Sequence, residues 1–114
     1  MSTFHFKQFA VQNKKSAMKV NTDSVLLGSW AEIPLDAKRG LDIGSGTGIL
    51  ALMIAQRSKE IKITGIEIEK NAFEESKINF ENSPYNNRLK AVNLPLQKFV
   101  SNLKFDCIIT NPPY

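Results

Sequence analysis

A glycine-rich turn between two apolar stretches is the feature that most constrains the fold of this chain. Residues 41–48 read LDIGSGTG, and the apolar residues 49–55 follow at once. This order predicts a β-strand, a tight turn and the start of a helix. Gly44, Gly46 and Gly48 permit a positive φ and let a ligand approach with no Cβ in the way. Open α/β sheets bind their ligands here, beyond the carboxyl end of a strand.

An acidic residue follows the turn at the spacing of a nucleotide-binding site. Glu67 ends the apolar stretch 61–66, which we predict to be the second strand, and stands 21 positions after Gly46. In dinucleotide-binding folds an acid about 20 residues beyond the glycine turn hydrogen-bonds a ribose. The alternative is an ordinary tight turn with Glu67 solvated at a strand end. We favour the binding site, because turn, helix and acid come in the expected order.

Composition restricts the class of protein. The 114 residues suffice for one small domain, and 42% hydrophobic with 23% charged residues is typical of a soluble globular chain. No apolar run approaches the roughly 18 residues of a membrane span, and the N-terminus lacks an export signal's apolar core. The lone Cys107 is expected to be a buried small hydrophobe, which fits a reducing cytoplasm. With His5 as the one histidine, we expect no histidine-based metal site.

Positive charge is concentrated near the N-terminus. The chain has a net charge of +4, and residues 1–22 contain lysines but no acid. These lysines are Lys7, Lys14, Lys15 and Lys19. Such a basic segment is a candidate contact for nucleic acid. A solvated surface segment explains the same charge equally well.

The rest of the chain predicts strands alternating with helices. A strand near residues 4–11 and a second at 18–20 would form a hairpin, after which Thr22 or Asp23 caps a helix that ends before Pro34. Further on we expect the first core strand after residues 38–40, a buried helix after the glycine turn, a strand at 61–66, a helix at 69–82, and strands at 88–93 and 104–110. This order implies an α/β fold with a parallel, doubly wound sheet and right-handed crossovers.

The fourth predicted core strand runs directly into Asn111, Pro112, Pro113 and Tyr114, on the same rim as the glycine turn. The two prolines remove backbone donors and fix φ, which leaves carbonyl oxygens with little conformational freedom. Asn111 adds an amide oxygen, and Tyr114 adds a flat aromatic face. Two acceptors can hold both N–H bonds of an NH₂ group while its lone pair points at an electrophile. The alternative is that the tetrapeptide only terminates a strand.

Together, the two motifs resemble those of class I S-adenosylmethionine-dependent methyltransferases. Residues 41–48 are similar to the cofactor loop of that superfamily, and residues 111–114 to the signature of members that methylate adenine N6, guanine N2 or a glutamine amide. More narrowly, the N-terminal part resembles bacterial tRNA (adenine-N6)-methyltransferases that modify the adenosine next to the anticodon of valine tRNA. That likeness is carried by FKQF at 6–9, MKVNTD at 18–23, LLG at 26–28 and WA at 30–31.

The resemblance implies a Rossmann-like core over residues 39–114 that binds S-adenosylmethionine, preceded by a hairpin and helix over residues 1–38. The glycines of the turn would face the methionine end of the cofactor, with Asp42 beneath them and Glu67 on the ribose hydroxyls. Thr22 and Asp23 would border the methionine end from the other side. Members often have an adenine-contacting acid after the third strand, whereas residues 93–97 contain none. Related enzymes also continue past the equivalent of Tyr114, so we expect the core sheet to be incomplete here.

The implied activity is methyl transfer to the N6 amine of an adenosine in tRNA, in the cytoplasm and without metal or membrane. Asn111 and the Pro112 carbonyl would hold the amine, Tyr114 would stack on the base, and the N-terminal lysines would contact RNA. Two alternatives stay open. The acceptor is another amino group, on rRNA guanine or protein glutamine, or the chain is a cofactor-binding or RNA-binding module without activity of its own.

Overall fold

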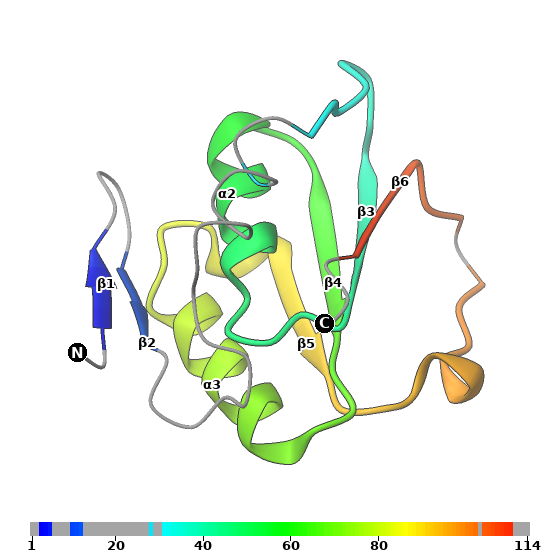
Figure 1. The fold of residues 1–114 in the computed structure, drawn as a ribbon. Helices are drawn as coiled ribbons and strands as arrows, with labels where there is room; N and C mark the ends of the chain where they lie inside the picture. The colour runs from blue at the N-terminus through cyan, green and yellow to red at the C-terminus, as the bar shows by residue number, and fades with distance from the viewer. Residues whose placement is uncertain (1–2, 6–9, 13–27, 29–30, 103, 111–114) are drawn as a thin grey trace.

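A four-stranded parallel sheet forms the centre of the described part of the chain. The structure is a computed structural model that describes residues 3–5, 10–12, 28, 31–102 and 104–110. The strand order is β5-β4-β3-β6 (Figure 1). The strands are β3 (Arg39–Ile43), β4 (Lys62–Ile66), β5 (Leu89–Val92) and β6 (Cys107–Thr110). The predicted parallel α/β sheet is confirmed, with strand ends displaced by a few residues.

Helices connect the first three core strands on one side of the sheet. They are α2 (Ile49–Arg57) and α3 (Lys70–Glu81), and the short 3₁₀ turns η1 (Asn86–Arg88) and η2 (Leu96–Lys98) complete the connections. The connection from β5 to β6 passes on the other side (Figure 1). Because β6 lies beyond β3 in the sheet, a right-handed crossover requires this change of side.

A two-stranded antiparallel hairpin precedes the core. β1 (Thr3–His5) pairs with β2 (Ala10–Gln12), with Phe4 opposite Val11. The hairpin therefore forms earlier than predicted, because the segment 4–11 that suggested one strand contains parts of both partners. Apolar alternation has the same period in both strands and does not mark where the chain reverses. The strand predicted at 18–20 and the helix predicted from Thr22 lie outside the described residues, apart from Gly28, which is helical.

The hydrophobic core lies between the two helices and the sheet. As predicted from its composition, α2 is apolar on nearly all sides, and six of its nine residues are buried. All of these except Leu50 pack with Ile61, Ile63, Phe80 and Leu89. Burying one such side chain contributes about 1.5–3 kcal/mol. This packing fixes α2, and with it the glycine turn that leads into α2, against the sheet.

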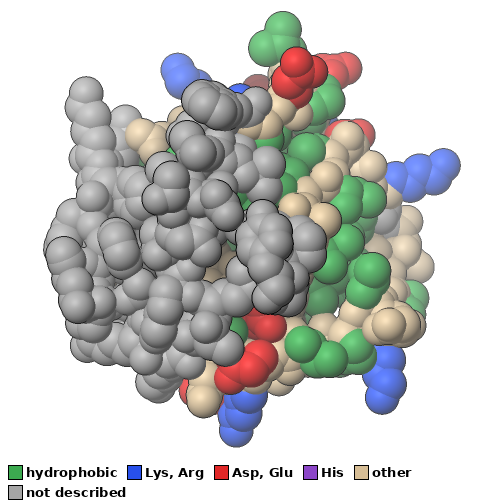
Figure 2. Space-filling view, viewed as in Figure 1, with side chains coloured by type: hydrophobic (Ala, Val, Ile, Leu, Met, Phe, Trp, Pro, Cys, Tyr) green, Lys and Arg blue, Asp and Glu red, His purple; other side chains and the backbone are tan. Residues whose placement is uncertain are grey.

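The outer side of β6 is the least covered part of the sheet. Cys107 is half-buried rather than buried, because no described strand pairs with β6 beyond β3. Val100 and Ile108 are 86% and 62% exposed. Figure 2 shows hydrophobic side chains gathered over this part of the molecule. An edge strand without a partner presents free backbone donors and acceptors, to which a further strand could pair. That the core sheet is incomplete stays a prediction.

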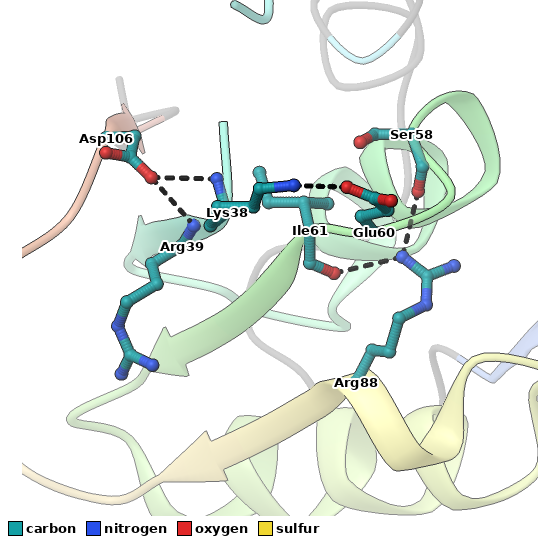
Figure 3. Close-up of polar contacts among 7 residues, drawn as sticks. All are labelled: Lys38, Arg39, Ser58, Glu60, Ile61, Arg88 and Asp106. Atoms are coloured by element: carbon teal, nitrogen blue, oxygen red, sulfur yellow. Dashed lines mark hydrogen bonds and ion pairs between the residues drawn. The ribbon is translucent and has the colours of Figure 1, made fainter. Parts of the chain in front are cut away.

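Arg88 ties the end of α2 to the start of β5 (Figure 3). Its guanidinium donates hydrogen bonds to the carbonyl oxygens of Ala55, Ser58 and Ile61, at 2.9, 2.8 and 2.9 Å. The Tyr85 ring centroid lies 5.4 Å from the guanidinium carbon. The last carbonyls of a helix lack intrahelical partners, and a cation there is favoured by the helix dipole. Arg88 thus satisfies acceptors that would otherwise be left unpaired.

Arg88→Lys should lower the free energy of unfolding by about 1–3 kcal/mol, because an ammonium cannot donate to three carbonyls in the fixed geometry of a guanidinium. Urea denaturation of the complete gene product measures the change. The control is Lys77→Gln, since Lys77 is exposed on α3 and should tolerate the change within about 0.5 kcal/mol. Equal stability of Arg88→Lys and wild type would show that these hydrogen bonds contribute nothing net.

Candidate functional site

The glycine turn lies at the carboxyl end of β3, as predicted. Gly44, Gly46 and Gly48 have φ values of 72°, 54° and 86°, which other residues adopt only with strain. Among the described residues, a Cβ on Gly44 would meet no atom within 4 Å. A Cβ on Gly48 would lie 2.6 Å from the ring of Phe80. Within the described part of the chain, Gly44 therefore borders open space, whereas Gly48 permits close packing of the turn against α3.

Glu67 joins the glycine turn to the start of α3. Its Oε1 accepts a hydrogen bond from the amide of Gly46 at 2.8 Å, and its Oε2 accepts one from the amide of Glu69 at 3.0 Å. The residue is 9% exposed, so it is not the solvated strand-end acid of the alternative interpretation. A carboxylate has about four lone-pair sites. Glu67 can therefore hold the turn and still accept hydrogen bonds from a ligand's hydroxyl groups.

Two asparagines, neither of them predicted from the sequence, form hydrogen bonds to the backbone of the same rim. The Asn79 Nδ2 on α3 donates to the carbonyl of Thr47 at 2.8 Å. The Asn93 Nδ2 donates to the carbonyls of Glu67 and Ile68, at 2.8 and 3.2 Å. Asparagine is unfavourable inside a helix, and that anomaly was the available signal for Asn79. Asn93 belongs to segment 93–97, in which the family resemblance led us to look for an acid.

Asp42 lies beneath the turn and is 1% exposed. Among the described residues, neither of its carboxyl oxygens has a hydrogen-bond partner, and neither has the Oγ of Ser45. Burial, together with the nearby Glu67, raises the pKa of Asp42 to about 7. The Ala51 amide nearby lacks the geometry of a hydrogen bond to Asp42 and offsets only part of this effect. Buried polar groups without partners are rare in folded proteins and concentrate at functional sites.

The structure brings five of the predicted site residues together: Asp42, Gly44, Gly46, Gly48 and Glu67. The other predicted site residues lie outside the described part of the chain: Lys7, Lys14, Lys15, Lys19, Thr22, Asp23, Asn111, Pro112 and Tyr114. Thr110, the residue before Asn111, ends β6 at the same rim, where its Oγ1 donates to the Ile43 carbonyl at 3.1 Å. Within the described residues, no helix is long and apolar enough to span a membrane, and no cluster of acids, histidine and cysteine suits a metal ion.

The sheet order and the glycine turn define a Rossmann-like domain of the class I methyltransferase type. The chain belongs to the methyltransferase small domain family, whose sequence model matches residues 10–114.

Curated relatives and solved structures agree with this membership. The chain is 46% identical over 114 residues to the tRNA1(Val) (adenine(37)-N6)-methyltransferase of Glaesserella parasuis, covering 100% of this chain and 48% of the relative. It is 48% identical over 113 residues to the protein of that name from Flavobacterium psychrophilum, covering 97% and 48%. A methyltransferase from Thiobacillus denitrificans, solved with S-adenosyl-L-homocysteine, matches at TM-score 0.63 and 25% identity, over 79% of this chain and 36% of that chain. The chain spans about half the length of the curated relatives it matches.

Asp42→Asn should change how stability depends on pH. Because the folded chain holds the Asp42 proton more tightly than the unfolded chain, this group's stabilisation is full below about pH 4 and is lost as the pH rises through about 7. The variant should lack this loss and be the more stable protein at pH 8, by on the order of a few kcal/mol. Urea denaturation at pH 5 and pH 8 measures the difference.

Asp106→Asn provides a control that should show the same change in stability as wild type between pH 5 and pH 8, because the Asp106 effect has the opposite sign and lies at more acidic pH. The Asp106 Oδ2 accepts hydrogen bonds from the amides of Lys38 and Arg39, at 2.7 and 3.0 Å (Figure 3). These bonds hold the pKa of Asp106 below its usual value, so its stabilisation is present at neutral pH and lost in acid. The account of Asp42 is wrong if Asp42→Asn and wild type show the same change in stability between pH 5 and pH 8.

Proposed function

We propose that the protein transfers a methyl group from S-adenosylmethionine to the N6 amine of an adenosine in tRNA. The observation that carries this proposal is the buried Glu67, which bridges the glycine turn and α3 at the carboxyl rim of a methyltransferase sheet. Curated relatives at 46% and 48% identity, named as tRNA1(Val) (adenine(37)-N6)-methyltransferases, support the choice of tRNA adenine. The neighbour solved with S-adenosyl-L-homocysteine supports the choice of cofactor.

The described residues fit this cofactor. No described atom fills the space beside Gly44, and the carboxylate of Glu67 has further lone pairs that can accept hydrogen bonds from ribose hydroxyls. We assign the methionine end to the glycine turn, bordered by Asp42 and, by family resemblance, by Thr22 and Asp23. Bound S-adenosylmethionine supplies an electrophilic methyl group on a sulfonium. The protein's own work is to bind, align and exclude water.

Residues 111–114 are assigned to the target base. The Asn111 amide oxygen and the Pro112 carbonyl oxygen accept hydrogen bonds from the two N–H groups of the amine, which turns its lone pair toward the methyl group. Tyr114 stacks on the base, an interaction worth about 1–3 kcal/mol. The adenosine must leave its stack in the RNA loop to reach this position. We assign phosphate contacts to Lys7, Lys14, Lys15 and Lys19, because four lysines without an acid form a basic segment.

The direct test is methyl transfer by the complete gene product. Unmodified valine tRNA, ribosomal RNA and a glutamine-bearing protein are each incubated with S-adenosylmethionine, and the products are analysed by mass spectrometry. The proposal expects N6-methyladenosine in tRNA. Methylguanosine or methylglutamine as the product would overturn the choice of acceptor. Cofactor binding without transfer to any acceptor would favour a binding module.

Glu67→Ala should weaken binding of S-adenosylmethionine by about 1.5–3 kcal/mol, or roughly ten- to a hundredfold, since it removes charged acceptors. Isothermal titration calorimetry measures the affinity. Glu60→Ala is the matched control, because Glu60 is exposed and pairs with Lys38 away from this rim. Unchanged affinity in Glu67→Ala would remove Glu67 from the cofactor site.

Asn111→Ala should reduce kcat strongly and leave cofactor affinity almost unchanged. The lone pair of a neutral adenine amine is delocalised into the ring, and two acceptors favour the pyramidal nitrogen that forms fully only in the transition state. Asn111→Asp keeps an acceptor and should retain more activity than alanine. Single-turnover kinetics on saturating tRNA test this. Near-normal kcat in Asn111→Ala would favour the strand-terminator interpretation.

A further inference from the structure

The sheet face turned away from α2 and α3 carries a cluster of positive charge that the proposed site does not use. Arg39 of β3 lies opposite Lys62 of β4, and Lys90 of β5 lies opposite Thr64, two residues along β4 from Lys62. Residues two apart on a strand point to the same face. The three cations therefore lie on one face across three neighbouring strands. We call Arg39, Lys62, Thr64 and Lys90 the basic face.

Burial confirms which way these side chains point. Ile63 and Leu89, which alternate with the basic residues along β4 and β5, belong to the core cluster beneath the helices. Lys62 and Lys90 are exposed, and Arg39 is half-buried. The two lysines are therefore presented to solvent on the side opposite the helices.

Among the described residues, neither Lys62 nor Lys90 forms an ion pair with an acid. The ion pair found in this part of the chain joins Lys38 to Glu60, not Lys62 or Lys90. Asp106, the acid next to Arg39, accepts hydrogen bonds from backbone amides and attracts Arg39 electrostatically, but the Arg39 guanidinium points away from it and forms no ion pair with it (Figure 3). The guanidinium carbon instead lies 5.6 Å from the centroid of the Phe105 ring.

Such an arrangement does not serve stability. Like charges directly opposite each other on neighbouring strands repel, and Arg39 and Lys62 are such a pair. A polyanion laid across the face would relieve this repulsion and would release its own counterions. The cluster therefore has the charge of a phosphate-binding surface.

We propose that the basic face binds the phosphate backbone of the tRNA substrate at a distance from the target adenosine. This inference rests on the proposed function. Arg39 begins β3 and Ile43 ends it beside the glycine turn. Four steps of about 3.3 Å separate the two ends by roughly 13 Å. A single ligand can contact both the basic face and the rim only if it is an extended polyanion. A folded RNA is an extended polyanion, whereas a free nucleotide is too small to span this distance.

Replacing both lysines tests the inference in the complete gene product. Lys62→Gln with Lys90→Gln should weaken tRNA binding about tenfold at low salt and lower the slope of log affinity against log salt by about 2. The kcat on saturating tRNA and the affinity for S-adenosylmethionine should stay at wild-type values. The midpoint of thermal unfolding should be equal or higher, because repulsion on the face is reduced.

The matched control removes the same charge elsewhere. Lys59 follows α2 and Lys77 lies on α3, and both are exposed. Lys59→Gln with Lys77→Gln should leave the salt slope nearly unchanged. An unchanged slope in the Lys62/Lys90 variant, or an equal loss in the control, would overturn the inference. The inference would also be overturned if the Lys62/Lys90 variant lost binding to phosphatidylserine vesicles while its binding of tRNA stayed intact.

Two different measurements distinguish failure of this inference from failure of the proposed function. The salt slope is measured by equilibrium binding without cofactor or turnover, whereas the proposed function is judged by methyl transfer from the wild-type protein. Transfer to tRNA with an unchanged slope in the lysine variant rejects only the basic face. Absence of transfer from wild type rejects the proposed function, and the slope still decides whether this face contacts RNA.

Discussion

The hydrogen bonds of the Glu67 carboxylate are the interaction on which the rest of the site depends. They join the Gly46 amide in the turn after β3 to the Glu69 amide before α3. The turn is also held from below, because the amides of Gly44 and Ser45 both donate to the Ile66 carbonyl, at 2.8 and 3.0 Å. Two consecutive residues, Ile66 at the end of β4 and Glu67 directly after it, therefore set the shape of the glycine turn. A ligand that uses Glu67 meets a rim already in place, and preorganisation of this kind reduces the cost of binding.

The rim combines strong packing with unsatisfied polar groups. Around it, α2 is buried on nearly all sides, and Gly48 lies against Phe80 with no room for a side chain. Directly beneath it, Asp42 is buried without a described partner and has its pKa raised to about 7. A core selected for stability alone would avoid such a carboxyl. Its presence beside Glu67 supports the proposal that this rim binds the cofactor, with stability supplied by the surrounding core.

Most of the core fold could be predicted from the sequence, because apolar runs and glycines mark its elements locally. The hairpin was misplaced, since alternation in residues 3–12 does not reveal where the chain turns. Asn79 and Asn93 were missed because their partners, Thr47 and Glu67, are distant in sequence. The basic face could not be predicted either, because it exists only through the register of three strands. Features that depend on neighbouring residues can be predicted from the sequence, whereas hydrogen-bond and strand partners that are set by the tertiary structure cannot.

The central claim is that Glu67 holds the glycine turn ready before any ligand binds. Amide hydrogen exchange of Gly46 and Glu69, followed by NMR with and without S-adenosylmethionine, tests it most directly. The account predicts that both amides exchange slowly in the protein alone, and that Glu67→Ala makes both exchange fast without unfolding the core. Fast exchange of both amides in the ligand-free wild type, with protection appearing only when the cofactor is added, would contradict the account.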